Sequence, residues 1–276
     1  MTYTPAAARR QEQLQAFDRL LTIMDELREQ CPWDRKQTLE TLRHLTIEET
    51  YELSDAILEG DRAEIKKELG DLMLHLVFYS RIASESPTDD RFDVADVLTA
   101  VCEKLIRRHP HIYGDANGQK VVADTEAQVK ANWEQLKLKE GNTSVLGGVP
   151  VSLPALVKAM RIQEKARGAG FDWDDKTQVW AKVEEEMAEF KAELTPPPGQ
   201  AVDAPHAEAE FGDLLFSLVN YARFMDINPE TALERTNKKF ISRFQHIEAR
   251  ARANGQALHQ LTLAQMEVYW NEAKVR

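Results

Sequence analysis

The feature that most constrains the fold of this chain is an acidic helical pattern that occurs twice. The first copy runs from Ile47 to Asp71 and the second from Val183 to Asp213. Because residues three or four positions apart share one face of a helix, each copy predicts two helices that bring paired carboxylates together. The acids are Glu48, Glu49, Glu52, Glu68 and Asp71 in the first copy, and Glu185, Glu186, Glu189, Glu210 and Asp213 in the second.

The residues around these acids are more informative than the acids themselves. A run of glutamates usually forms a solvated helix face. Asp71, however, lies in Glu-Leu-Gly-Asp-Leu-Met-Leu-His-Leu-Val, and Asp213 in Glu-Phe-Gly-Asp-Leu-Leu-Phe-Ser-Leu-Val. A carboxylate on such an apolar helix needs a counter-charge or a bound cation. Gly70 and Gly212 lie inside these helices, where Gly costs about 0.5–1 kcal/mol relative to Ala, and they predict close approach of another helix or a ligand.

The duplication extends beyond the acids. Trp33-Asp34 recurs as Trp173-Asp174, Lys104 and Arg108 as Lys239 and Arg243, and Trp133 as Trp270. A repeat of this length indicates a duplicated domain rather than a solenoid. The stretch 140–154 contains Gly and Pro, lacks helical periodicity and predicts an interdomain linker. We therefore expect two domains, 1–142 and 143–276.

Apolar residues recur with helical periodicity along most of the chain, and no segment has the features of a convincing strand. The sequence therefore predicts an all-α protein made of two helical bundles. The predicted helices cover 14–29, 38–58, 62–84, 94–108, 121–138, 156–167, 178–194, 206–225, 229–252 and 262–274.

Charge and hydropathy exclude several classes of protein. A formal net charge of −11 argues against a partner that is a nucleic-acid polymer, because such binding needs a basic surface. No stretch approaches the roughly 18–20 apolar residues of a membrane span, and the N-terminus does not resemble a signal peptide, so we expect a cytoplasmic protein. Cys31 and Cys102 lack metal-ligand spacing and are expected to be ordinary thiols.

The acid sets predict a metal site with oxygen ligands only. Such a site suits Mg²⁺ or Mn²⁺ better than zinc, and the Glu-x-x-His pattern of di-iron bundles is absent from both copies. Since Mg²⁺ is usually shared between a few carboxylates and substrate phosphates, a phosphorylated ligand is expected. Lys239 and Arg243 share a helix face and could contact the phosphates, whereas Trp270 could cover a base or belong to the core or a dimer interface.

Further motifs carry a family resemblance. Together with the acid pairs of both halves, they are Cys-Pro-Trp-Asp at 31–34, Arg-Arg-His-Pro-His at 107–111 and Gly-Phe-Asp-Trp at 170–173. On these residues the chain resembles the MazG nucleoside triphosphate pyrophosphohydrolases with two tandem domains, over nearly its whole length. The acid motif alone is also found in dimeric dUTPases and phosphoribosyl-ATP pyrophosphatases.

The resemblance implies Mg²⁺-dependent hydrolysis of ribo- and deoxynucleoside triphosphates to the monophosphate and pyrophosphate, mainly by the C-terminal domain. It implies Glu186, Glu189, Glu210 and Asp213 as metal ligands, and the catalytic candidates are these four with Glu185. Whether Glu185 or Glu186 faces the site depends on the helix phase. The implied substrate-binding residues are Lys182, His206, Asn237, Lys239, Arg243 and Trp270. His206 stands where the family leads us to expect a lysine.

The N-terminal copy offers a second candidate metal site, formed by Glu49, Glu52, Glu68 and Asp71. Leu45 and Cys102 replace the equivalents of Lys182 and Asn237 there, so we expect this domain to be weaker, differently specific or mainly architectural.

Several alternatives stay open at the level of sequence. One is a narrower pyrophosphatase that acts on dUTP or on damaged nucleotides, and another is a regulatory module that senses nucleotides without turnover. A helical unit with few helices exposes apolar faces, so a homodimer is expected unless the two halves cover each other within one chain.

Overall fold

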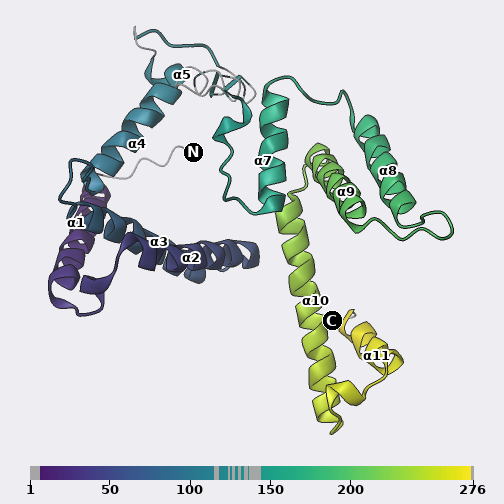
Figure 1. Cartoon of the computed structure of the whole chain (residues 1–276). Coiled ribbons are helices and arrows are strands. Elements are labelled where there is room, and N and C mark those ends of the chain that lie inside the picture. Colours follow the sequence, from purple (N-terminus) through teal and green to yellow (C-terminus); the bar gives the residue numbers. More distant parts are fainter. Residues whose placement is uncertain are drawn as a thin grey trace. The chain divides into compact units, whose positions relative to one another are not determined.

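The computed structural model describes residues 7–114, 118–123, 125, 128–129, 132–133, 136 and 144–274. The chain divides into two compact units, Met1–Ala123 and Asp124–Arg276. Among the described residues every regular element is helical, with ten α-helices and three short 3₁₀ turns (Figure 1). The predicted all-α class is therefore confirmed for this part of the chain. The predicted domain boundary after residue 142 stays a prediction, because 137–143 lie outside the described residues.

The first unit is built from two long helices that form a hairpin and a third that packs on them. In chain order its helices are α1 (Ala7–Gln30), α2 (Leu39–Glu59), α3 (Arg62–Ala83), α4 (Val94–Arg108) and α5 (Pro110–Tyr113), with the 3₁₀ turn Asp34–Lys36 between α1 and α2.

The sequence fixes the α2–α3 connection by helix capping. Gly60 ends α2 with φ of 72°, a left-handed conformation that favours glycine. The Asp61 side chain then accepts hydrogen bonds from the backbone N–H groups of Ala63 and Glu64, and so caps α3. The connection is thus short enough to lay α2 along α3, as the sequence predicted.

The core of the first unit lies where α1 and α2 meet α3. Met24, Leu42, Val77 and Phe78 are buried there, each no more than 3% exposed. Full burial of one such side chain contributes about 1.5–3 kcal/mol. This core fixes the rotation of α2 and α3 about their axes and hence the face on which their acids lie.

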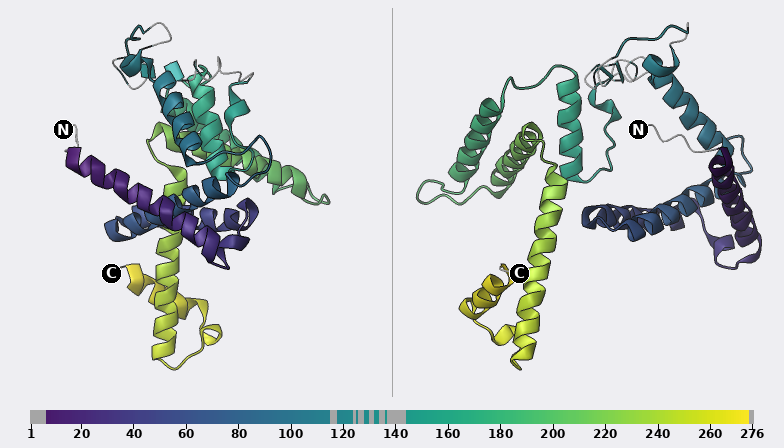
Figure 2. Two further views of the ribbon diagram at one scale, coloured as in Figure 1. Left: turned by 90° about the vertical axis from the view of Figure 1, so that its left-hand side faces the viewer. Right: turned by 180° about the vertical axis from the view of Figure 1, so that it is seen from behind.

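The second unit repeats a helical hairpin and adds a long arm. Its α-helices are α7 (Ala155–Gly168), α8 (Lys176–Glu193), α9 (Ala204–Phe224), α10 (Pro229–Ala253) and α11 (Leu263–Lys274), and its 3₁₀ turns are Leu146–Gly148 and Leu258–Gln260. α8 packs along α9, while α7 and α10 contact α9. α11 lies beside α10, away from the α8–α9 pair, in all three views (Figures 1 and 2).

Side chains at the helix starts explain where α8, α9 and α10 begin. Asp175 accepts from the backbone N–H groups of Thr177 and Gln178, Asp203 from that of His206, and Asn228 from that of Thr231. α9 and α10 also carry proline in the first turn, where its fixed φ suits a helix. The α10–α11 contact has a core of its own, in which Ile247, Ala251 and Leu261 are buried.

Two local predictions need correction. The helix expected over 121–138 does not begin at Val121, because 121–123 are not helical, and much of its remainder lies outside the described residues. The short helix α5 was not predicted; Pro110 starts it, as proline can at the first helical position.

The explanation expected for the two mid-helix glycines is also partly wrong. A Cβ built on Gly70 or Gly212 would meet no atom within 4 Å in the part of the chain that the structure describes. No other helix therefore approaches either glycine there. Approach by a ligand stays a prediction.

The state of the two cysteines and the hydropathy of the helices can also be compared with the sequence. Cys31 and Cys102 are free cysteines, as expected. Across the described residues, every helix is too short or too polar to cross a membrane.

Candidate active site

The second unit brings three of its predicted acids together. Glu186 and Glu189 on α8 and Glu210 on α9 each place a carboxylate oxygen within 4.8 Å of the other two. Glu186 is only 6% exposed, Glu210 is half-buried and Glu189 is exposed. We call these three residues the second acid cluster. Asp213, one turn beyond Glu210, is exposed and is not among these three.

The helix phase that the sequence left open is now defined. Val179 and Val183 of α8 are fully buried, and Glu186 continues their stripe at helical spacing. Glu185 is exposed and lies outside the three-acid group. The buried Glu186 therefore faces α9.

Lys182 provides the counter-charge of the second acid cluster. Its Nζ lies 2.6 Å from Oε1 of Glu186 and 2.9 Å from Oε1 of Glu185. Hydrogen bonds to Glu186 and then to Glu185 raise the pKa of Lys182 well above its usual value. Partial desolvation, followed by the charges of Glu186 and Glu210, raises the pKa of Glu189. The site therefore concentrates negative charge that a single lysine offsets only in part.

His206 also lies beside this cluster. Its Nδ1 is 3.4 Å from Oε2 of Glu193 and 3.8 Å from Oε1 of Glu210. The structure thus places the imidazole at the start of α9, next to the acids, where protonation would add a positive charge.

The remaining predicted substrate-binding residues lie on α10 and α11. The Arg243 guanidinium lies 5.4 Å from the centroid of the Trp270 ring, and that ring also packs against Phe240. Lys239 is exposed, and Nδ2 of Asn237 donates to Oε2 of Glu234. The structure therefore groups Arg243 with Trp270, and it groups Lys182 and His206 with the acids.

A pocket of about 500 Å³ adjoins the second acid cluster. Lys182, Glu186 and Asp213 line its acidic side. Other walls carry the aromatic side chains of Phe171, Trp173 and Phe216, which are 85%, 45% and 41% exposed. Its volume lies within the usual range for sites that bind small molecules.

An ion pair that sequence reasoning missed secures the loop at this pocket. Nη1 of Arg223 donates to Oδ2 of Asp172 at 2.9 Å, and Nη2 donates to Oδ1 of the same carboxylate. Burial alone would raise the pKa of Asp172, but hydrogen bonds from Arg223 and the Trp173 N–H outweigh it and lower that pKa. The signal was present, since Arg81 and Arg223 occupy the same place in the two copies.

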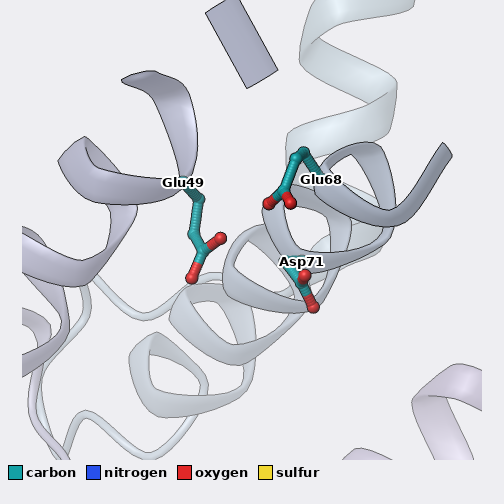
Figure 3. A group of neighbouring side chains, drawn as sticks. All are labelled: Glu49, Glu68 and Asp71. Atoms are coloured by element: carbon teal, nitrogen blue, oxygen red, sulfur yellow. The ribbon is translucent and has the colours of Figure 1, made fainter. Parts of the chain in front are cut away.

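The first unit contains a similar group of acids. Glu49 on α2 and Glu68 and Asp71 on α3 each place a carboxylate oxygen within 4.8 Å of the other two (Figure 3). Glu68 is 2% exposed, and its Oε1 lies 2.7 Å from Nζ of Lys67. We call Glu49, Glu68 and Asp71 the first acid cluster. Glu52, the fourth predicted acid, is not among these three.

A buried polar network lies on the same two helices. Oγ1 of Thr46 is 3.1 Å from Nδ1 of His75 and 2.6 Å from the hydroxyl of Tyr79. His75 is 7% exposed, and its burial lowers its pKa, although the charge of Asp71 acts in the opposite direction. In the second copy Ser217 takes the place of His75.

Comparison with known proteins agrees with the geometry of the acids. Residues 37–113 match the model of the MazG nucleotide pyrophosphohydrolase domain. The chain is 41% identical over 263 residues to the nucleoside triphosphate pyrophosphohydrolase/pyrophosphatase MazG of Thermotoga maritima, covering 94% of this chain and 95% of that protein. It is 41% identical over 265 residues to the nucleoside triphosphate pyrophosphohydrolase of Escherichia coli K12, covering 94% and 97%. Similarity at this level, over at least 94% of this chain and of each relative, leaves one conclusion: the chain belongs to the MazG family of nucleoside triphosphate pyrophosphohydrolases.

Proposed function

We propose that this chain hydrolyses ribo- and deoxynucleoside triphosphates to the monophosphate and pyrophosphate, using Mg²⁺ or Mn²⁺ at the second acid cluster. The observation that carries the proposal is the meeting of three carboxylates, with oxygens within 4.8 Å of one another, beside a pocket of about 500 Å³. The activity in the names of the Thermotoga and Escherichia relatives supports it.

The residues of the cluster fit a divalent cation. Carboxylate oxygens are the ligands that Mg²⁺ and Mn²⁺ prefer, and Glu186, Glu189 and Glu210 would hold the ion. Desolvation first, and then repulsion from Glu186 and Glu210, raise the pKa of Glu189, and a bound cation would relieve that repulsion. When bound, the cation offsets phosphate charge and polarises the phosphoryl group. Asp213 lines the pocket next to this site and is the further candidate ligand.

The other residues of the site act on the triphosphate and its leaving group. Lys182 is held cationic and lines the pocket, so its Nζ can donate to a phosphate oxygen. His206 lies beside Glu210, and its imidazole N–H is a second donor that can reach a phosphate oxygen. We assign Asn237, Lys239, Arg243 and Trp270 to the nucleotide on their match to the family motif. Charge from Lys239 and Arg243 would stabilise the pyrophosphate as it leaves.

The test is a panel of eight ribo- and deoxynucleoside triphosphates with Mg²⁺, in which pyrophosphate and phosphate release are measured separately. We expect pyrophosphate as the first product. Glu186→Gln should lower kcat/KM by about 100-fold or more, because it removes a buried carboxylate of the cluster. The matched control is Glu208→Gln, an exposed position on α9. Phosphate as the first product, or full activity of Glu186→Gln, would refute the proposal.

The same panel with dUTP included separates the alternatives. Turnover of dUTP alone would indicate a narrow pyrophosphatase, and binding without product would indicate a nucleotide-sensing module. Either result would replace broad triphosphate hydrolysis as the function.

We also propose that the chain forms a homodimer. The second unit exposes large apolar side chains along α9 and α10, which a partner copy would cover. They are Phe211, Leu215, Leu218, Leu233, Phe240 and Ile241. Light scattering on the full-length protein should give twice the chain mass, and a monomer at all concentrations would contradict this.

A further inference from the structure

We propose that the pocket beside the second acid cluster takes the nucleobase, and that Gln163 and Asn220 read its hydrogen-bonding edge. This inference rests on the proposed function, because it assumes that the triphosphate is held at the acidic side of the same pocket. Both residues line the pocket, and so do Lys182 and Glu186 on its acidic side.

Gln163 is a buried side chain with one unused hydrogen-bonding atom. It lies on α7, is 6% exposed, and its Nε2 donates to the backbone oxygen of Phe216 at 2.7 Å. A carbonyl oxygen accepts only from the NH₂ end of the amide, so this bond fixes the amide orientation. Oε1 is buried and accepts no hydrogen bond within the described residues. A buried acceptor without a partner is destabilising, and an N–H donor from a ligand would satisfy it.

Helix packing alone does not require a glutamine at this place. In the first unit, α1 packs against α3 through the buried apolar side chain of Met24. In the second unit, α7 packs against α9 and the polar side chain of Gln163 is buried. A polar residue that is buried without full satisfaction lowers stability, and such residues are often kept for a ligand.

Asn220 supplies the complementary group. Its Oδ1 accepts from Nε of Arg223 at 3.1 Å and from Nη2 at 2.8 Å. A guanidinium has only donors, so Oδ1 points to Arg223 and Nδ2 remains as a donor. Among the described residues, Nδ2 of Asn220 donates no hydrogen bond. The residues that line the pocket therefore include one unpaired buried acceptor, on Gln163, and one unpaired donor, on Asn220.

A donor and an acceptor that line one pocket can together pair with the Watson–Crick edge of a base. In adenine these are the 6-amino group and N1, and each of the other bases also presents an N–H next to an acceptor. The exposed aromatic rings of Phe171, Trp173 and Phe216 provide surfaces on which a flat base can stack. A site of this kind accepts many bases and discriminates against a base whose edge lacks one of the two groups.

The experiment uses ATP analogues that differ by one group. Purine riboside triphosphate lacks the 6-amino donor, and 1-deaza-ATP lacks the N1 acceptor. kcat/KM for pyrophosphate release is measured in the full-length chain carrying Glu49→Gln, which disables the first acid cluster. We expect each analogue to be hydrolysed about tenfold less efficiently than ATP, because one buried partner is left unpaired.

Variants identify the residue that reads each group. In Gln163→Met, kcat/KM for ATP divided by kcat/KM for purine riboside triphosphate should come to within about twofold of one. In Asn220→Ala, the same ratio for ATP and 1-deaza-ATP should come to within about twofold of one. The control is Gln245→Met, an exposed position on α10, which should keep both ratios. If circular dichroism shows that Gln163→Met does not fold, the ratio of kcat/KM for ATP to that for 1-deaza-ATP in Asn220→Ala tests the inference by itself.

Equal efficiency for ATP and both analogues in the parent chain, or ratios that persist in both variants, would overturn the inference. These results are distinct from failure of the proposed function, because pyrophosphate release from ATP by the wild type reports that function independently. A wild-type chain that releases no pyrophosphate from any triphosphate would overturn both.

Discussion

Glu185 and Glu186 are neighbours in the chain and have different environments. Glu186 continues the buried stripe of α8 and meets Glu210, whereas Glu185 is exposed and contacts Lys182. The sequence predicted the set of acids, since their residue types and spacing are local properties. It did not predict the choice between these two, because the phase of a helix is set by the surface on which it packs.

The Asp172–Arg223 pair gives a prediction for stability and its dependence on pH. The pKa of Asp172 is lowered in the folded protein, so its contribution to stability is present above the unfolded pKa near 3.8 and is lost as pH falls through the lower folded value. Asp172→Asn should lower the free energy of unfolding at pH 7 by about 1–3 kcal/mol, because the Arg223 side chain is 15% exposed and would lose its charged partner.

Urea unfolding between pH 3 and pH 7 measures this contribution. The control is Asp174→Asn, an exposed carboxylate two positions along the same loop. If Asp172→Asn unfolds at the same urea concentration as the wild type at pH 7, the pair does not secure the loop.

His75 gives a second pH prediction, of a different kind. Burial lowers its pKa, so folding favours the neutral imidazole. Its stabilising contribution is complete above the unfolded pKa near 6.5 and is lost as pH falls toward the folded value, with a limiting slope of about 1.4 kcal/mol per pH unit. His75→Ser, which introduces the residue of the second copy, should flatten the dependence of the unfolding free energy on pH between 5 and 7.

The wild type and Thr88→Ser, an exposed substitution in the same unit, are the references. Equal slopes in the wild type and His75→Ser would show that protonation of this histidine is not linked to folding.

At the scale of the helices, periodicity and capping residues carry most of the information. Gly60 and Asp61 lie in the gap between the helices expected over 38–58 and 62–84, and the structure shows them as the C-cap of α2 and the N-cap of α3. The group of Arg243 and Trp270 shows the limit of this approach. Arg243 and Trp270 recur in both copies, and this repeat led to the prediction that they bind the nucleotide. Gln163 and Asn220, which line the pocket, were not predicted, because an isolated amide on a helix has no distinctive spacing.

The open surroundings of Gly212 predict that alanine is tolerated there. A Cβ would meet no described atom within 4 Å, so Gly212→Ala should raise the free energy of unfolding by about 0.5–1 kcal/mol through helix propensity. Gly60→Ala is the matched contrast: its φ of 72° is unfavourable for alanine, and it should be destabilising by about 1 kcal/mol. Thermal unfolding measures both. Loss of pyrophosphate release in a well-folded Gly212→Ala would instead show that a ligand or a second copy approaches this face.

At the scale of the whole chain, the duplication raises the question of how activity is divided between the two acid clusters. The first unit matches the family model and keeps three clustered acids, but Leu45 stands at the position of Lys182. We expect the second unit to dominate, so Glu49→Gln should lower kcat by less than about twofold. Glu186→Gln should remove nearly all activity, and the double variant should match it. Comparable losses from the two single variants on the same substrate panel would show that both clusters turn over substrate.

In each half a lysine pairs with a buried acid of the cluster, but the two lysines do not occupy corresponding positions of the repeat. Lys67 lies on the second helix of its hairpin and Lys182 on the first, yet each reaches the most deeply buried acid of its cluster, at 2.7 Å and 2.6 Å. Each lysine places a positive charge beside a buried carboxylate and so lowers the cost of burying that carboxylate without a bound ion. Treatment with a chelator should therefore leave the protein folded, because Lys67 and Lys182 already offset part of the carboxylate charge.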